Sequence, residues 1–388
     1  MMSFLADGGR PLLMLGTAYI IYLLRTYRQK GSLVDSVVAT AMFKCSDPRD
    51  HLYSLLSIPE ADPHGLKADY SLPIEEVCMQ FAKATMVSGQ SLKALSLAPH
   101  TTFVPGGPPP ARLALPSWVP DLSCQGPANP LVSYTIRPQL FHAGGKEEPN
   151  VTLSDGGRLL CVSGRVVDKV AAMARCQADV PFPSEEDVHP KSGIHARLIK
   201  RAATWFQECC EVAGEKYWKT KAGVAPKQEQ QPVREESREE AELRRGFLET
   251  LLCGMTAMRD PIPDELLEAM QIYVDYLVDY FTEGYEVSEE VMETILTYGA
   301  LLEQSLLGVT ESRRFCRTEQ GRLGQVRIDA REGDVFVCIL GAEVPYLLRP
   351  NMKRVGVYTL IGDSFLLGVM QGEALSDARY ETIDISIE

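Results

Sequence analysis

The sequence predicts an α+β protein in which a helical N-terminal half packs on a small C-terminal antiparallel β-barrel or meander. Apolar residues recur mostly at helical spacing before about residue 310. After that point, short apolar runs alternate with turn signals rich in Gly, Asp and Pro. These runs cover residues 335–340, 344–348, 355–361 and 365–370. Because they are almost continuously apolar, several strands should be buried on both faces.

The same patterns divide the chain into five regions. An apolar helical segment (1–44) precedes a helical region (45–150), strands that join the C-terminal sheet (151–180), a second helical region (181–310) with a charged flexible insertion near 214–239, and an antiparallel β module (311–388). At 388 residues the chain is long enough for two or three domains.

Composition excludes several classes of protein. Hydrophobic residues make up 45% and charged residues 23%, which is typical of a globular protein with a sizeable core. The net charge of -13, with scattered basic residues, argues against a nucleic-acid binder that depends on neutralising phosphates. The ten cysteines form no C-x-x-C and no zinc-ligand spacing, so we expect no metal site, free thiols, and a cytoplasmic location.

Residues 11–24 form an apolar stretch near the N-terminus. It is shorter than the roughly twenty residues that span a bilayer. Basic residues follow it (Arg25, Arg28, Lys30), whereas a signal peptide carries them in front. We expect a buried core helix, and a membrane-associated segment is the alternative that stays open.

The first clear helix start lies at residues 47–50. Asp47 can accept hydrogen bonds from free backbone N–H groups, Pro48 suits the first helical position, and Asp50 has the spacing of a capping box. Other segments with helical spacing are 33–43, 73–88, 194–212, 240–258 and 263–307, whereas 157–173 is strand-like.

Arg49 is the polar residue that most invites a functional interpretation. The favoured hypothesis is structural: a partly buried guanidinium that ties the helix start to Asp69 or Asp121 through bidentate hydrogen bonds. The alternative is an anion-binding arginine.

Three further residues have both a structural and a functional interpretation. Trp118, between two prolines, is expected to be a packing anchor between the helices and the strands, with a ligand platform as the alternative. Asp334 and Glu373 each follow a glycine and are expected to be turn residues, with paired acid/base carboxylates as the alternative. No Cys/His signature or phosphate loop stands out, so we expect no catalytic residue and no cofactor.

Separated motifs resemble those of fungal heterokaryon-incompatibility (HET) proteins. The order of the motifs over residues 45–375 makes the resemblance fairly specific. They are D-P-R-D followed by Y-x-L-L (47–56), D-Y-S (Asp69, Tyr70 and Ser71), L-P-S-W-V-P-D (115–121), a G-x-x-x-D-x-V strand (164–170) and the C-terminal series G-x-L-G, G-D, G-x-x-x-P-x-x-L-R, Y-x-L-I-G-D and G-x-M-x-G-E (321–373).

The resemblance covers the region downstream of the family's HET domain. The tryptophan-rich segments of that domain are not found, since the only tryptophans are Trp118, Trp205 and Trp218. Three explanations stay open: a truncated paralogue, an incomplete gene model or an independent module. The resemblance implies a role in non-self recognition and programmed cell death, and no activity of the HET domain is carried over.

We therefore expect a non-catalytic interaction protein, with a protein partner that could be a full-length family member. An enzyme or small-ligand binder with a pocket between helices and barrel is the second hypothesis, with Arg49, Trp118 and Asp121 as its first residues to test. A truncated paralogue without independent function is the third.

Overall fold

The computed structural model describes the chain in several separate segments, and all statements below concern those segments. They are residues 26, 32–41, 43–57, 65–98, 113–123, 130–132, 139–181, 193–214, 237–256, 260–283, 297–298, 302, 305–306, 310 and 312–388, with the main chain alone for 193–199 and 276–283.

The described strands form one nine-stranded sheet organised around a long strand, β2 (Leu159–Met173). Strands β2, β5, β6, β7 and β9 close into a ring, because β5 pairs with both β6 and β2. All described pairings are antiparallel except that of β7 with β9. The other strands are β1 (Thr152–Ser154), β3 (Arg313–Thr318), β4 (Leu323–Arg327), β5 (Val335–Ile339), β6 (Tyr346–Pro350), β7 (Val357–Asp363), β8 (Phe365–Leu366) and β9 (Thr382–Ile387).

Strand β2 belongs to the ring at one end and leaves it at the other. Residues 160–165 pair with β9, residues 164–169 with β5, and residues 170–173 with β3, with register shifts after Val166 and Val170. Such bulges bend a strand and increase its twist. At Gly164, where both neighbours pair, an added Cβ would lie 2.9 Å from the Cys338 carbonyl oxygen. A glycine therefore permits the close approach that closes the ring.

The strands of the C-terminal region are buried on both faces, as their apolar runs predict. Every residue of β4 and β5 is buried. In β5, Val335, Val337 and Ile339 belong to one core cluster, whereas Phe336 and Cys338 belong to another. This confirms the predicted α+β class with a C-terminal, mostly antiparallel sheet.

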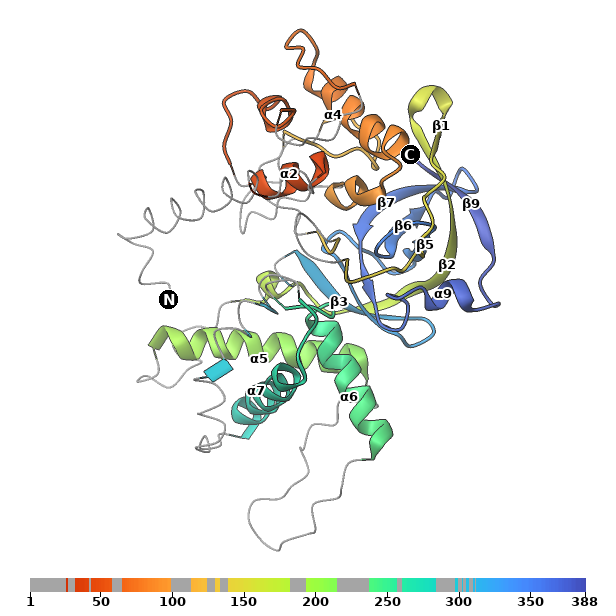
Figure 1. Ribbon diagram of the computed structural model, residues 1–388. Coiled ribbons are helices and arrows are strands. Elements are labelled where there is room, and N and C mark those ends of the chain that lie inside the picture. The colour runs from red at the N-terminus through yellow and green to blue at the C-terminus, as the bar shows by residue number, and fades with distance from the viewer. Residues whose placement is uncertain are drawn as a thin grey trace, which may run out of the picture.

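The N-terminal helices lie over the ring (Figure 1, orange and red). They share a core with the sheet, in which Phe81 and Leu95 join the cluster that contains Val337 and Leu360. The elements are α2 (Leu33–Thr40), α3 (Asp50–Tyr53), α4 (Ile74–Ala82), its π-helical continuation (Lys83–Ser88) and a 3₁₀ helix (Leu92–Leu97). The seam between these helices and the sheet is thus a single apolar core.

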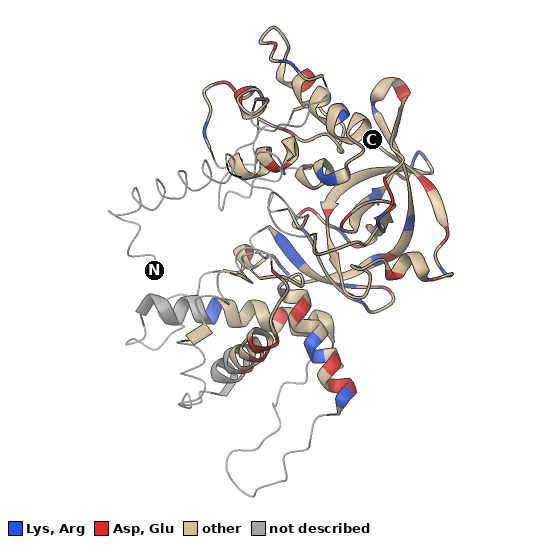
Figure 2. Ribbon diagram, in the orientation of Figure 1, with Lys and Arg blue, Asp and Glu red and all other residues tan. Residues whose placement is uncertain are grey.

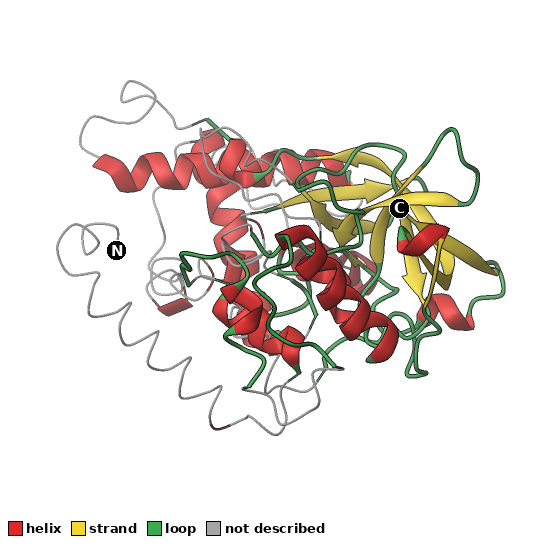
Figure 3. Cartoon of the chain, turned by 90° about the horizontal axis from the view of Figure 1, so that it is seen from above, coloured by secondary structure: helices red, strands yellow, loops and turns green. Residues whose placement is uncertain are grey.

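A second helical layer lies on the opposite side in Figure 1, below β3. It consists of α5 (Gly193–Ala213), α6 (Arg238–Leu251) and α7 (Asp264–Glu283). Trp205 and Phe206 are buried there together with Phe247 and Phe315. Figure 3 shows from above that helices lie on one side of the molecule and most strands on the other. Short helical turns also occur at Asp155–Gly157, Gln177–Asp179 and α9 (Glu373–Ser376).

Several predicted boundaries are wrong. The run 365–370 is a strand only at its first two residues, because the chain turns at Gly368 (φ +80°) and the Leu366 N–H donates to the Met370 sulfur. Helix α6 ends at Leu251 instead of residue 258, since Cys253 (φ +51°) leaves the helical region. Strand β7 starts two residues after Val355, which is exposed.

Two predictions fall outside the described residues. They concern the apolar stretch 11–24 and nearly all of the charged insertion 214–239. In the described part of the chain, no helix combines the length and the apolar character needed to cross a bilayer.

Candidate functional site

Arg49 is held by its own turn. Its Nε and Nη2 donate to the two carboxylate oxygens of Asp47 at 2.9 and 2.7 Å, and its Nη1 donates to the carbonyl oxygens of Tyr70 and Leu72 at 2.6 and 2.9 Å. The predicted partners Asp69 and Asp121 are therefore wrong. The hydrogen bonds with Asp47 hold the pKa of that carboxyl below its usual value. Arg49 thus joins the helix start to the 70–72 turn through main-chain carbonyls.

The acids next to Arg49 also serve local structure. Asp47 accepts the Arg49 N–H at 3.0 Å in the turn before α3, but the N-cap of α3 is Arg49, without a side-chain cap. The predicted capping box is therefore wrong, and Asp50 instead accepts the Tyr70 hydroxyl at 2.5 Å. Asp69 accepts from the N–H and hydroxyl of Ser71. The Tyr70 ring lies against Arg49, with 5.3 Å from the guanidinium carbon to the ring centre.

Asp334 directly follows the turn at residues 332–333, as predicted, whereas Glu373 is the first residue of the short helix α9. Asp334 is buried and accepts from Arg349 Nε and Nη2, each at 2.8 Å, and from the Arg331 N–H at 2.8 Å. Glu373 accepts the Gln371 N–H at 2.7 Å. No contact between these two carboxylates is among those described, and each carboxylate is bonded to its own neighbours in the chain or the sheet.

The segment 113–121 is fastened to the sheet by two side chains. Trp118 is fully buried and donates its indole N–H to the Arg158 carbonyl oxygen at 3.0 Å. The Ser117 hydroxyl accepts the Leu360 N–H at 2.8 Å and donates to the Glu388 carbonyl oxygen. The segment thereby contacts β7, the end of β9 and the turn before β2.

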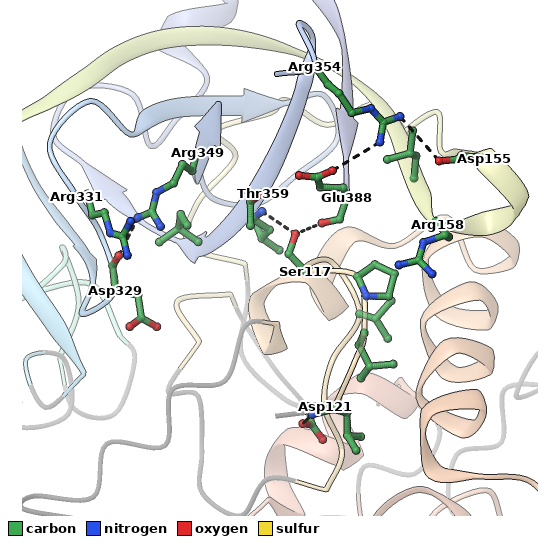
Figure 4. A pocket seen from close by; sticks show the side chains of 17 residues that line it. Ser117, Asp121, Asp155, Arg158, Asp329, Arg331, Arg349, Arg354, Thr359 and Glu388 are labelled. Atoms are coloured by element: carbon green, nitrogen blue, oxygen red, sulfur yellow. Dashed lines mark hydrogen bonds and ion pairs between the residues drawn. The ribbon is translucent and has the colours of Figure 1, made fainter. Parts of the chain in front are cut away.

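A cavity of about 650 Å³ opens between this segment and the ring (Figure 4). Such a volume lies within the range of small-molecule sites. Its walls combine apolar side chains with charged ones. The lining residues are Leu113, Leu115, Pro116, Ser117, Val119, Asp121, Asp155, Arg158, Leu159, Asp329, Arg331, Arg349, Arg354, Thr359, Leu360, Ile361 and Glu388.

Of the residues that the sequence singled out, Asp121 lines this cavity, whereas Arg49 and Trp118 do not. The sequence analysis did not identify the arginines that line this cavity. Arg349 ends the G-x-x-x-P-x-x-L-R motif, which is the signal that could have pointed to it. Arg331 carries no motif, and its place depends on how the ring closes.

The described cysteines are free thiols, and burial disfavours the thiolate form at several of them. All nine are thiols outside any disulfide. Burial raises the pKa of Cys210 and of Cys338 to about 12, so these thiols stay protonated near neutral pH. In the described segments, no cluster of His, Cys, Asp and Glu could hold a metal ion.

An exposed apolar turn joins β6 to β7. Met352 is 94% exposed and Val355 is 102% exposed. The turn has a defined shape, because the Asn351 side-chain oxygen accepts the N–H groups of Lys353 at 2.9 Å and Arg354 at 3.2 Å. We refer to residues 351–356 as the β6–β7 tip.

Comparison with known proteins identifies the C-terminal region. The family model of the Het-6 beta-barrel domain matches residues 286–383. The chain thus carries a domain of the fungal HET-6 incompatibility proteins, which confirms the resemblance, and no HET domain is detected. The matched residues contain β3 to β8, whereas β2 lies outside them and yet completes the ring. Searches of curated proteins and of solved structures find no match.

Proposed function

We propose that this chain is a cytoplasmic, non-catalytic interaction or signalling protein in fungal non-self recognition and programmed cell death. Its partner would be another protein, and a full-length incompatibility protein is the first candidate. The Het-6 barrel domain supports the link to heterokaryon incompatibility. The role within that process is our inference.

The exposed β6–β7 tip is the observation that supports the proposal of a protein partner. Met352 and Val355 present apolar side chains to solvent, and Lys353 and Arg354 lie between them in the chain. Methionine and arginine are enriched at protein interfaces. The hydrogen bonds of Asn351 fix the turn, so little conformational entropy would be lost on binding.

The bonds of the other polar residues support a non-catalytic role. Arg49 and Asp47 bind each other, Asp334 binds Arg349, and Glu373 binds a turn N–H. Charges of both signs are interspersed on the described helices and strands (Figure 2). This distribution fits a protein partner better than a nucleic acid.

The test is the double variant Met352→Ser/Val355→Ser, assayed by calorimetry against a full-length incompatibility protein. We expect binding at least about tenfold weaker, because apolar anchors dominate interface energies. Ile383→Ser, at a partly exposed position of β9, is the matched control and should bind as the wild type does.

Equal binding by the double variant would refute the tip as the contact surface. When the two proteins are co-expressed in a fungal host, the amount of cell death should follow binding. The double variant should differ from wild type, and Ile383→Ser should not. A hydrolase activity that one substitution abolishes would contradict the non-catalytic part of the proposal.

A further inference from the structure

The cavity beside segment 113–121 has a surplus of hydrogen-bond donors. Among the described residues, the guanidinium groups of Arg158 and Arg331 have no hydrogen-bond or ion-pair partner. Arg354 makes only long ion pairs, at 3.8 Å with Asp155 and 3.7 Å with Glu388. All three arginines line the cavity.

Arg349 adds a donor whose direction is fixed. Its Nε and Nη2 are held by the Asp334 carboxylate, and Nη2 also donates to the Asp329 carbonyl oxygen at 2.9 Å. Its Nη1 donates to no described residue. Figure 4 shows the Arg349 and Arg331 side chains close together at one end of the cavity, with Arg158 at the other. A pre-oriented guanidinium loses less freedom when it binds an anion.

Two of the four acidic residues that line the cavity accept hydrogen bonds through their carboxylates. Asp121 accepts from the N–H and hydroxyl of Ser123 at 2.9 and 2.5 Å. Glu388 accepts from the Asn351 amide at 2.7 Å. Among the described residues, the Asp155 carboxylate makes only the long ion pair with Arg354. The groups available to a ligand are therefore this carboxylate, the guanidinium groups of Arg158 and Arg331, and Nη1 of Arg349.

Apolar side chains complete the walls. Leu115, Pro116 and Val119 come from the fastened segment, and Leu360 and Ile361 come from β7. Ligand sites commonly combine such walls with a few convergent polar groups.

We propose that this cavity binds a small organic anion, with its carboxylate or phosphate at Arg331 and Arg349 and its apolar body between segment 113–121 and β7. Nothing in this inference depends on the β6–β7 tip. The ligand class is one that pairs an apolar or aromatic body with a carboxylate or a phosphate ester.

The test uses three probes with one shared body: 2-naphthyl phosphate, 2-naphthoate and neutral 2-naphthol, titrated by calorimetry at low salt. We expect at least one anion to bind about tenfold more tightly than 2-naphthol, because charge-assisted hydrogen bonds are stronger than neutral ones. The tighter of the two anions identifies a phosphate or a carboxylate as the natural group.

Arg331→Gln should weaken the binding of that anion about tenfold. Arg238→Gln, on the exposed face of α6 and outside the cavity, is the matched control and should bind within about twofold of wild type. Arg331 is exposed, so its variant should fold, and an unchanged melting temperature checks this.

Three results would overturn the proposal: equal affinity for 2-naphthol, wild-type affinity in Arg331→Gln, or no saturable binding of any probe. The Met352→Ser/Val355→Ser variant should bind the anion normally. Failure of this inference is therefore distinguishable from failure of the proposed function.

Discussion

Arg313 and Asp363 form an ion pair inside the protein core. Arg313 Nη2 lies 2.6 Å from Asp363 Oδ1, and Nη1 donates to the Asp363 carbonyl oxygen at 2.8 Å. Both side chains are at most 1% exposed. Asp363 also accepts the Leu131 N–H at 2.5 Å, so β3, the end of β7 and the 130–132 segment meet at one carboxylate. The pair fastens the ring to β3, which lies outside it.

Asp363→Asn should destabilise the protein by about 3–5 kcal/mol, because removing one partner leaves a buried guanidinium without its counter-charge. Urea denaturation measures the change in the free energy of unfolding. Asp384→Asn, at an exposed position of β9, is the control and should stay within about 0.5 kcal/mol of wild type. Similar unfolding midpoints for the two variants would show that the buried ion pair contributes nothing to the free energy of unfolding.

Ser117→Ala should destabilise the protein by about 1–3 kcal/mol, since the Leu360 N–H loses its buried acceptor. Hydrogen exchange at the Leu360 amide should become faster, which is a local readout of the same bond. Ser57→Ala, at an exposed position after α3, should change neither quantity. Unchanged exchange at Leu360 in Ser117→Ala would mean that this hydroxyl does not hold the segment on β7.

Gly362→Ala should be more destabilising than Gly333→Ala. Both glycines have positive φ, +142° and +86°, so both substitutions strain the backbone. Only at Gly362 would the new Cβ also meet a neighbour, at 2.6 Å from Arg327 Cγ. Burial, and then the nearby Arg313, lower the pKa of Arg327 to about 10, which shows how enclosed this side chain is. Thermal melts of the two variants compare their losses of stability. Equal melting temperatures would argue against a close contact between the new Cβ at position 362 and Arg327.

Arg379→Gln should raise the pKa of the Asp377 carboxyl. Hydrogen bonds from the Arg379 side chain, and then from its N–H, lower that pKa from 3.8 to about 2. A carboxyl with a lowered folded-state pKa contributes stability that is present above its unfolded value and is lost as pH falls through the folded value. For Asp377 this window runs from about pH 4 down to about pH 2. Carboxyl carbon shifts measured by NMR give the titration, and an unmoved midpoint in Arg379→Gln would contradict the assignment.

The sequence predicted the candidate residues better than their partners. It placed Asp334 beside a turn because a glycine precedes it, and local turn chemistry is readable from neighbouring residues. The same reasoning was wrong for Glu373, which begins the short helix α9. It predicted that Arg49 forms hydrogen bonds with Asp69 or Asp121, whereas the carboxylate that Arg49 binds belongs to Asp47, two residues away. The cavity was not predictable, because its walls come from segments more than two hundred residues apart in the chain.

The sequence by itself determined the α+β class, most helices and the strand-and-turn order of the C-terminal region, since apolar periodicity and turn residues act over a few neighbours. The tertiary structure alone decided that β2 closes the ring, that β7 and β9 run parallel, and that Arg313 meets Asp363. Those features depend on contacts between residues far apart in the chain. No local sequence pattern specifies such contacts, because the apolar face of a strand indicates that the strand is buried but does not indicate which strand pairs with it.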